Sequence, residues 1–136
     1  MIERGEGWIV NVSSGTANPA AGPPFKTDGV AAKVGMYGTS KAALNRMTNA
    51  LAVELHGTGV RINAVAPRAA VASEGAMALL GDGLDQALFE SMEAMVEGTV
   101  TLCDCAPDDT GRAHVTLDLI ESRNIEVMGL DGQPLS

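Results

Sequence analysis

Aromatic side chains are scarce in this sequence of 136 residues, at 3% of the total, while alanine, glycine and methionine are plentiful. A core without many rings must be filled by aliphatic side chains and close helix packing, which is typical of α/β proteins. The length is sufficient for one domain with a real core and too short for two ordinary domains. A hydrophobic fraction of 46% and a charged fraction of 19% are those of a globular protein.

Positive charge is also in short supply, with 9 Lys and Arg against 17 Asp and Glu and a formal net charge of -8. Phosphate binding needs a cationic surface, and no basic cluster reverses the balance locally, so we expect no nucleic-acid partner. No apolar run is long enough for a signal peptide or a membrane span. The sequence therefore predicts no membrane partner and, by default, a cytoplasmic location.

Cysteine and histidine are rare, and their positions do not form a metal-site pattern. The two cysteines, Cys103 and Cys105, stand one residue apart, where a disulfide would be strained. His56 and His114 are distant in sequence and have no carboxylate cluster beside them, whereas a zinc site needs three or four ligands. We therefore expect two reduced thiols near a helix end and no metal, which argues against a metal-dependent hydrolase.

The first half of the chain has the pattern of a strand, a helix and a second strand. Residues 8–12 are an apolar run with the character of a buried parallel strand, and residues 60–66, stopped by Pro67, have the same character. Between them, residues 36–56 have the period of a helix, and residues 18–35 before it are predicted as a long loop. One face of the helix is predicted to point inward; it carries Leu44, Met47, Leu51 and Leu55. The other face is predicted to pack on a second helix; it carries Ala42, Ala43, Ala50 and Val53.

The second half predicts two more helices and one more strand. We expect a short helix over 74–80, a turn at 81–83 and a long helix over 85–103, with Asp85 and Glu90 near its start. A third strand is expected over 114–120, where Asp118 is unusual among apolar neighbours. The side chains of the long helix predicted to face inward are Leu88, Met92, Met95, Val96 and Leu102. The expected organisation is one domain over 1–120 with a C-terminal extension over 121–136.

Tyr37 and Lys41 stand four residues apart and so share one face of the predicted helix. A phenol has a reference pKa near 10, too high for a base at neutral pH, and a nearby ammonium favours the phenolate. The pair is therefore chemically sensible for proton transfer. By itself the spacing is common, and a tyrosine packed on a helix beside a solvated lysine is the alternative.

The surroundings of the pair favour a site. Ser13 and Ser14 follow the first strand directly, and the second strand returns with Asn63 and ends at Pro67. Ligands of open parallel sheets bind at the carboxyl ends of the strands, where these residues and the start of the helix are expected to meet.

Three blocks in this order resemble the short-chain dehydrogenase/reductase family. They are residues 7–14, 37–44 and 60–67, which read GWIVNVSS, YGTSKAAL and VRINAVAP. The resemblance covers about residues 2–119 and implies the C-terminal half of a Rossmann-like, doubly wound parallel sheet with flanking helices, the N-terminal nucleotide-binding half being absent.

The resemblance also implies an activity and a role for individual residues. The reaction would be hydride transfer between NAD or NADP and a small-molecule carbonyl or secondary alcohol. Tyr37 would be the general acid/base, and Lys41 would favour its phenolate and bind the nicotinamide ribose. Ser14 rather than Ser13 would hold the substrate oxygen. Pro67 and a backbone amide near Ala70 would border the nicotinamide.

Four features depart from the family pattern. Arg68 stands where glycine usually follows the proline, and residues 72–73 replace an expected threonine. The insertion over 19–33 would lie over the substrate pocket or be a surface loop without a role. The family's glycine-rich phosphate loop has no counterpart, since the glycines at 5–7 precede their strand and those at 57–59 end a helix.

Two functional interpretations remain open at this stage. One is an NAD(P)-dependent oxidoreductase represented by its catalytic half, and the other is a truncated non-catalytic remnant that at most associates with a related chain. A half-domain would leave the edge of the first strand unpaired and its apolar side chains uncovered, so we expect the chain to be unstable or inactive alone. The resemblance implies a homo-oligomer, a dimer or tetramer, formed through the helix of Tyr37 and the last strand.

Overall fold

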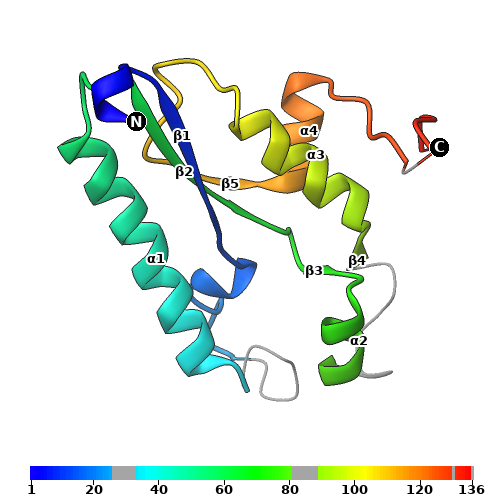
Figure 1. The fold of residues 1–136 in the computed structure, drawn as a ribbon. Coiled ribbons are helices and arrows are strands. Elements are labelled where there is room, and N and C mark those ends of the chain that lie inside the picture. The colour runs from blue at the N-terminus through cyan, green and yellow to red at the C-terminus, as the bar shows by residue number, and fades with distance from the viewer. Residues whose placement is uncertain (26–32, 81–88, 130, 136) are drawn as a thin grey trace.

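A three-stranded parallel sheet is the centre of the computed structural model, which describes residues 1–25, 33–80, 89–129 and 131–135 (Figure 1). The strands are β1 (Gly7–Val12), β2 (Val60–Ala66) and β5 (Ala113–Val115), in the order β1-β2-β5. The register of β1 on β2 runs from Gly7 opposite Val60 to Val12 opposite Val65. The prediction of an α/β fold with a parallel sheet and flanking helices is confirmed.

Helices cover both faces of this sheet. Helix α1 (Gly35–Glu54) lies on one side, and α3 (Met92–Leu102) and α4 (Thr116–Arg123) lie on the other (Figure 1). A strand covered on both faces is mostly apolar, and in β2 every residue from Ile62 to Ala66 is buried, among them the polar Asn63. The mainly apolar sequence of β2 thus has a direct structural cause.

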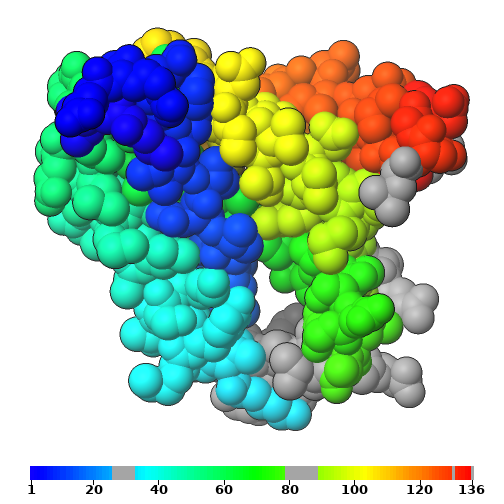
Figure 2. Space-filling model, viewed as in Figure 1, coloured from blue at the N-terminus to red at the C-terminus, as the bar shows by residue number. Residues whose placement is uncertain are grey.

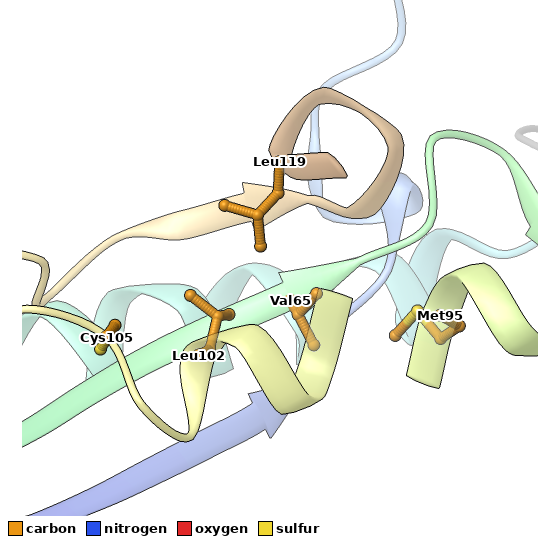
Figure 3. Packing of buried hydrophobic residues seen from close by; sticks show 5 residues of the cluster. All are labelled: Val65, Met95, Leu102, Cys105 and Leu119. Atoms are coloured by element: carbon orange, nitrogen blue, oxygen red, sulfur yellow. The ribbon is translucent and has the colours of Figure 1, made fainter. Parts of the chain in front are cut away.

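The main hydrophobic cluster lies between the sheet and the pair α3 and α4 (Figure 3). Trp8 and Val10 of β1 pack against it from the edge of the sheet. Both cysteines are free thiols as predicted, Cys105 buried in this cluster and Cys103 exposed. The cluster consists of Val65, Met95, Leu102, Cys105 and Leu119.

Helix α1 packs on the sheet through a slightly different face from the one its leucines predict. Gly38, Thr48 and Ala52 are its buried residues, and Met47 of the predicted stripe is 48% exposed. Thr48 is polar, and its burial is possible because its hydroxyl donates to Leu44 O at 2.9 Å and accepts from Asn11 Nδ2 at 2.9 Å.

A second, small sheet lies beyond the end of β2. It pairs β3 (Ala70–Val71) with β4 (Phe89–Glu90) in parallel, and α2 (Glu74–Leu80) follows β3, confirming the predicted short helix. The prediction of one helix over 85–103 is wrong in its first part, because β4 precedes α3. Ser91 caps α3 by accepting a hydrogen bond from Ala94 N at 3.1 Å, so the helix begins only after it.

Two of the residues predicted to face inward from α3 do so, Met95 and Leu102, whereas Met92 and Val96 are about half exposed. Leu88, Asp85 and the predicted turn at 81–83 lie outside the described residues.

The predicted strand over 114–120 is also wrong beyond its first residues. Only Ala113–Val115 form β5, and the chain then turns into α4. Thr116, Leu119 and Ile120 are the buried residues of α4, a spacing of three and four that belongs to a helix and not to a strand. Asn124 ends the helix with φ 50°, a left-handed conformation that asparagine tolerates.

The remaining described elements are short. Two 3₁₀ turns, η1 (Ile2–Arg4) and η2 (Gly15–Ala17), flank β1, and an isolated antiparallel bridge joins Met128 to Pro134 near the C-terminus. Among the residues described, no helix combines the length and apolar character needed to cross a membrane, and no three His, Cys, Asp or Glu side chains gather as a metal site would require.

Candidate active site

Three segments converge where β1 and β2 end: the turn after β1, the first turns of α1, and the chain that leaves β2 (Figure 1). Beyond this edge the surface is hollowed between the first part of α1 and α2, as Figure 2 shows between the cyan and green atoms. The predicted site residues therefore come to the edge where ligands of parallel sheets bind.

Lys41 and Tyr37 lie on the same side of α1. The Lys41 ammonium donates a hydrogen bond to Val12 O at 2.8 Å, the carbonyl of the last residue of β1. Its Nζ lies 5.6 Å from the centroid of the Tyr37 ring, within the range of a cation–π contact. Tyr37 is 49% exposed, so its ring is accessible from solvent while the lysine is held against the strand.

Ser14 is 9% exposed and starts the turn η2. Its Oγ accepts hydrogen bonds from Thr16 N at 3.2 Å and from Thr16 Oγ1 at 2.9 Å. These bonds fix the direction of the serine hydroxyl, which keeps its own proton available for another acceptor. Ser13 is also buried, and its Oγ has no hydrogen-bond partner among the described residues.

The turn after β1 and the start of α1 touch through a glycine. A Cβ added to Gly38 would stand 2.5 Å from Thr16 O, closer than such atoms approach in proteins. Glycine at this position therefore lets the helix turn that carries Tyr37 lie directly against the turn that carries Ser14.

The chain leaving β2 lies against the same turn from the other side. A Cβ on Gly15 would be 3.3 Å from Pro67 O and 3.2 Å from Arg68 O. Residues 67–70, which we call the post-β2 segment, continue into β3, where Ala70 pairs with Phe89. The structure thus brings together the neighbourhoods of Ser14, Tyr37, Lys41 and Pro67, and Ala70 follows at the start of β3.

Glu90 was not predicted to belong to this region, because the sequence indicated a helix there. Its side chain is buried, 5% exposed, and Oε1 accepts a hydrogen bond from the backbone N–H of Arg68. The backbone N–H of Ala69 lies near enough to act on the same carboxyl. Burial raises the pKa of the Glu90 carboxyl above its ordinary value, while the bonds from Arg68 and Ala69 oppose the rise.

Arg68, which replaces the expected glycine, is anchored by its side chain to α4. Its Nη2 lies 2.6 Å from Asp118 Oδ1 and 3.3 Å from Glu121 Oε1. Asp118 is therefore an exposed residue in the first turn of a helix, with an arginine partner, and not a strand residue. Asn63, in contrast, is buried in the middle of β2 and hydrogen-bonded to Asp109 O and Arg112 N, so its role is structural.

This arrangement can transfer a proton and hold a polar ligand. It supplies an exposed phenol beside an ammonium, a fixed serine hydroxyl and a stretch of main chain at one edge of the sheet. Residues 26–32 of the predicted insertion over 19–33 lie outside the described residues, and its described residues, 19–25 and 33, form no helix or strand.

Comparison with known proteins identifies relatives of this region. The family model for short chain dehydrogenases matches residues 1–81, which include β1, α1, β2 and β3. Galactitol 2-dehydrogenase (L-tagatose-forming) of Cereibacter sphaeroides is 40% identical over 67 residues, 49% of this chain and 23% of that protein.

Solved structures share the fold over most of the chain. One from Beutenbergia cavernae, assigned as an NAD(P)-dependent gluconate 5-dehydrogenase and holding NADP at low occupancy, matches 85% of this chain and 46% of its own, with 29% identity and a TM-score of 0.65. A gluconate 5-dehydrogenase from Burkholderia cenocepacia, in complex with NADP and tartrate, matches 84% of this chain and 44% of its own, with 18% identity and a TM-score of 0.65. The chain thus spans less than half the length of these structures.

Proposed function

Because this chain belongs to the short chain dehydrogenase family, we propose that it serves hydride transfer between NAD or NADP and a carbonyl or secondary alcohol. One observation carries the proposal. The Lys41 ammonium is bonded to the end of β1 and lies beside the ring of Tyr37, at the edge where Ser14 is fixed. A phenol held in this way can give a proton to, or take one from, a substrate oxygen.

We infer a separate role for each of these residues. Tyr37 is the general acid/base, and its half-exposed ring is accessible to a substrate. Lys41 uses one of its three N–H donors on Val12 O, which leaves donors for a ribose hydroxyl. Ser14 donates its hydroxyl proton to the substrate oxygen, since its Oγ already accepts two bonds from Thr16.

The residues fit the nicotinamide end of the cofactor. When bound, NAD or NADP would supply or accept the hydride, while this chain would orient the ring and move the proton. Lys41, Tyr37, Pro67 and the main chain near Ala70 would hold the ribose and the carboxamide. Relatives with NADP bound support the cofactor class, and the choice between NAD and NADP stays open.

The pyrophosphate end has no counterpart in the sequence, since no glycine-rich loop follows a strand and opens a helix. We therefore propose that these residues correspond to the C-terminal half of the family domain, the half that carries the acid/base pair. The share of each solved structure that the chain matches, 46% and 44%, agrees with a length of about half a family domain and does not say which half.

The relatives' names suggest a substrate class to examine first. They act, by those names, on galactitol and on gluconate, both of which carry several secondary hydroxyls. We propose a polyhydroxylated secondary alcohol or the corresponding ketone as substrate, with Ser14 and Tyr37 meeting the reacting oxygen.

The direct test is a titration of the purified chain with NADPH and NADH, followed by nucleotide fluorescence, and a rate measurement with galactitol and gluconate. We expect Tyr37→Phe to keep nucleotide binding and to lower turnover by about 10²- to 10⁴-fold, the usual contribution of a general acid/base. Lys41→Met should weaken both binding and turnover. Arg46→Met removes an exposed cation from the same helix and should change neither.

An alternative function is a non-catalytic chain that associates with a related chain, which the lack of a phosphate loop favours. In that case wild-type protein would bind neither nucleotide, and Tyr37→Phe would be indistinguishable from it. Mixing with a full-length relative and following the size of the complex by light scattering would then reveal association.

A further inference from the structure

Glu90 holds the post-β2 segment through both its side chain and its main chain. Its Oε1 accepts from the N–H group of Arg68, its carboxyl is also within reach of the N–H of Ala69, and its carbonyl oxygen accepts from Ala72 N at 3.1 Å. Through these bonds, one residue of β4 contacts both ends of the segment 68–72. The pairing of Val71 with Glu90 in the small parallel sheet fixes the same register.

A buried carboxyl makes such a contact only at a cost in desolvation free energy. Glu90 is 5% exposed, and its Oε2 has no hydrogen-bond partner among the described residues. Removing a carboxylate from water costs free energy that only good hydrogen bonds offset, and an apolar residue would avoid the cost. Its presence therefore points to a requirement for the shape of the main chain it binds.

The main chain that Glu90 holds includes Arg68, which stands where glycine usually follows the proline in the family. Outside glycine, the described residues contain one positive φ, at Asn124, so Arg68 adopts an ordinary backbone conformation. Its N–H is bound by Glu90 at one end, and its guanidinium is bound by Asp118 and Glu121 at the other. Thus β4 holds the backbone of Arg68, and α4 holds its side chain.

The fixed segment reaches the candidate site through the turn after β1. The carbonyl groups of Pro67 and Arg68 lie against Gly15, the residue next to Ser14. A shift of residues 67–70 would therefore displace the turn that carries Ser14.

We propose that Glu90 is a positioning residue: its buried carboxylate holds the N–H groups of Arg68 and Ala69 and so sets the shape of the post-β2 segment for the nicotinamide. The role toward the nicotinamide rests on the function proposed above, whereas the contact with the main chain does not. Glu90 itself touches neither substrate nor cofactor in this role.

The first measurement needs no ligand. In ¹⁵N-labelled protein, Glu90→Ala should speed hydrogen exchange at the Arg68 and Ala69 amides about tenfold or more, and leave amides of β2 such as Ala64 unchanged. Glu90→Gln keeps the shape and one acceptor but loses the charge, so its effect should be smaller, about two- to threefold. Glu97→Ala, which removes a carboxylate from α3, is the matched control and should change neither amide.

The second measurement is an NADPH titration of the same four proteins. We expect affinity to fall about tenfold in Glu90→Ala, with Glu90→Gln intermediate and Glu97→Ala equal to wild type. Unchanged exchange at Arg68 and Ala69 in Glu90→Ala overturns the main-chain role. Equal NADPH affinity in Glu90→Ala and wild type overturns the role toward the nicotinamide.

The two measurements separate this inference from the proposed function. Absence of NADPH binding in wild-type protein would contradict the proposed function, and with it the nicotinamide role of Glu90. The exchange result would still decide whether Glu90 holds the main chain.

Discussion

Burial changes the ionisation of two side chains among the described residues, Glu90 and Cys105. Each lies in a low-dielectric environment that disfavours its charged form, so the pKa of each is raised. For Cys105, Asp109 adds to the rise, while Arg61, Arg123 and the hydrogen bond from Asn63 oppose it. The consequence for Glu90 is a dependence of stability on pH, and for Cys105 a lack of reactivity.

Replacing Glu90 by glutamine should flatten the pH dependence of stability in mildly acidic solution. Burial raises the pKa of this carboxyl above its ordinary 4.5, with Arg68 and Ala69 opposing the rise and Asp118 adding to it. Between 4.5 and the raised value the folded chain therefore binds more protons than the unfolded chain. Wild-type stability should fall as pH rises through that window, by at most about 1.4 kcal/mol per pH unit, relative to Glu90→Gln.

Urea denaturation of both proteins at closely spaced pH values above 4.5 measures this difference. If the difference in unfolding free energy between wild type and Glu90→Gln grew in favour of wild type with rising pH, the carboxyl would be stabilised in its charged form and the assignment of its environment would be wrong.

The two thiols should differ sharply in reactivity. Thiolate is the reactive form, and burial both shields Cys105 and disfavours its thiolate, whereas Cys103 is exposed. We expect a thiol reagent to modify one cysteine quickly in the folded protein and the second only after urea is added. Mass spectrometry of the labelled peptide, with Cys103→Ser as control, identifies the reactive residue; rapid labelling of Cys103→Ser would contradict the burial of Cys105.

Gly38→Ala should destabilise the protein although alanine is the better helix former. The helix preference favours alanine by about 1 kcal/mol, but the new Cβ would stand 2.5 Å from the backbone oxygen of Thr16. Since a backbone atom cannot move away cheaply, overpacking of about 1–3 kcal/mol should win. Gly35→Ala, in the first turn of the same helix with nothing within 4 Å of the added carbon, should be neutral or stabilising. Chemical denaturation of the two variants compares them directly.

Sequence patterns predict the reacting residues of the site better than the residues that support them. The spacing of Tyr37 and Lys41 is visible because a helix brings positions four apart onto one face. The role of Glu90 depends on the pairing of β3 with β4, which joins residues about 20 positions apart. A local sequence pattern does not predict a contact between such distant residues. Thr16 and Gly38 act in the same way, through a close approach that only the fold creates.

At the scale of elements, the predictions for β1, α1, β2 and α2 are confirmed, and those for the later chain are partly wrong. Residues 114–120 contain enough apolar side chains for a strand, and the helical period of Thr116, Leu119 and Ile120 is too short to be distinctive. The tertiary contacts decide the matter, since the hydroxyl of Thr116 donates to Ala66 O at 3.1 Å, where the chain turns off the sheet. The start of α3 was misplaced because the cap at Ser91 follows a strand of two residues.

Asp109 links β5 to α4 and should be the most sensitive carboxylate in this part of the fold. It is buried, its Oδ1 lies 3.0 Å from His114 Nε2, and its Oδ2 accepts from Arg123 Nη2. Asp109→Asn leaves Arg123 without its charged partner and should cost about 2 kcal/mol of unfolding free energy. Asp108→Asn, a change at the exposed neighbour, should cost less than about 0.5 kcal/mol. Equal losses in thermal or urea denaturation would show that the linkage carries no stability.

For the whole molecule, the described residues leave two apolar surfaces uncovered. Strand β1 pairs with β2 on one side and with no described strand on the other. The second surface is a stripe along the outer side of α1, formed by Met36, Ala43, Met47 and Ala50, which helical geometry places on one face. Met36 is 85% exposed and Met47 48% exposed. Met47, which the sequence predicted to face inward, therefore lies on the outer side of α1.

The outer stripe of α1 supports the expected homo-oligomer. Small residues such as Ala43 and Ala50 allow two helices to approach closely, and the methionines supply adaptable apolar contact. The residues predicted for the second packed face, Ala42 and Val53, are exposed too and border the stripe. A second copy of the chain packed there would remove this apolar area from water.

Met47→Glu should therefore shift the chain toward the monomer. A charge at the centre of a buried helix pair would have to be desolvated without a partner, which costs several kcal/mol and lowers the association constant at least about 100-fold. Met77→Glu adds the same charge at a methionine of similar exposure on α2 and should leave association unchanged. Sedimentation velocity over a range of concentrations measures both variants. Equal association of Met47→Glu and wild type would exclude the α1 stripe as the interface.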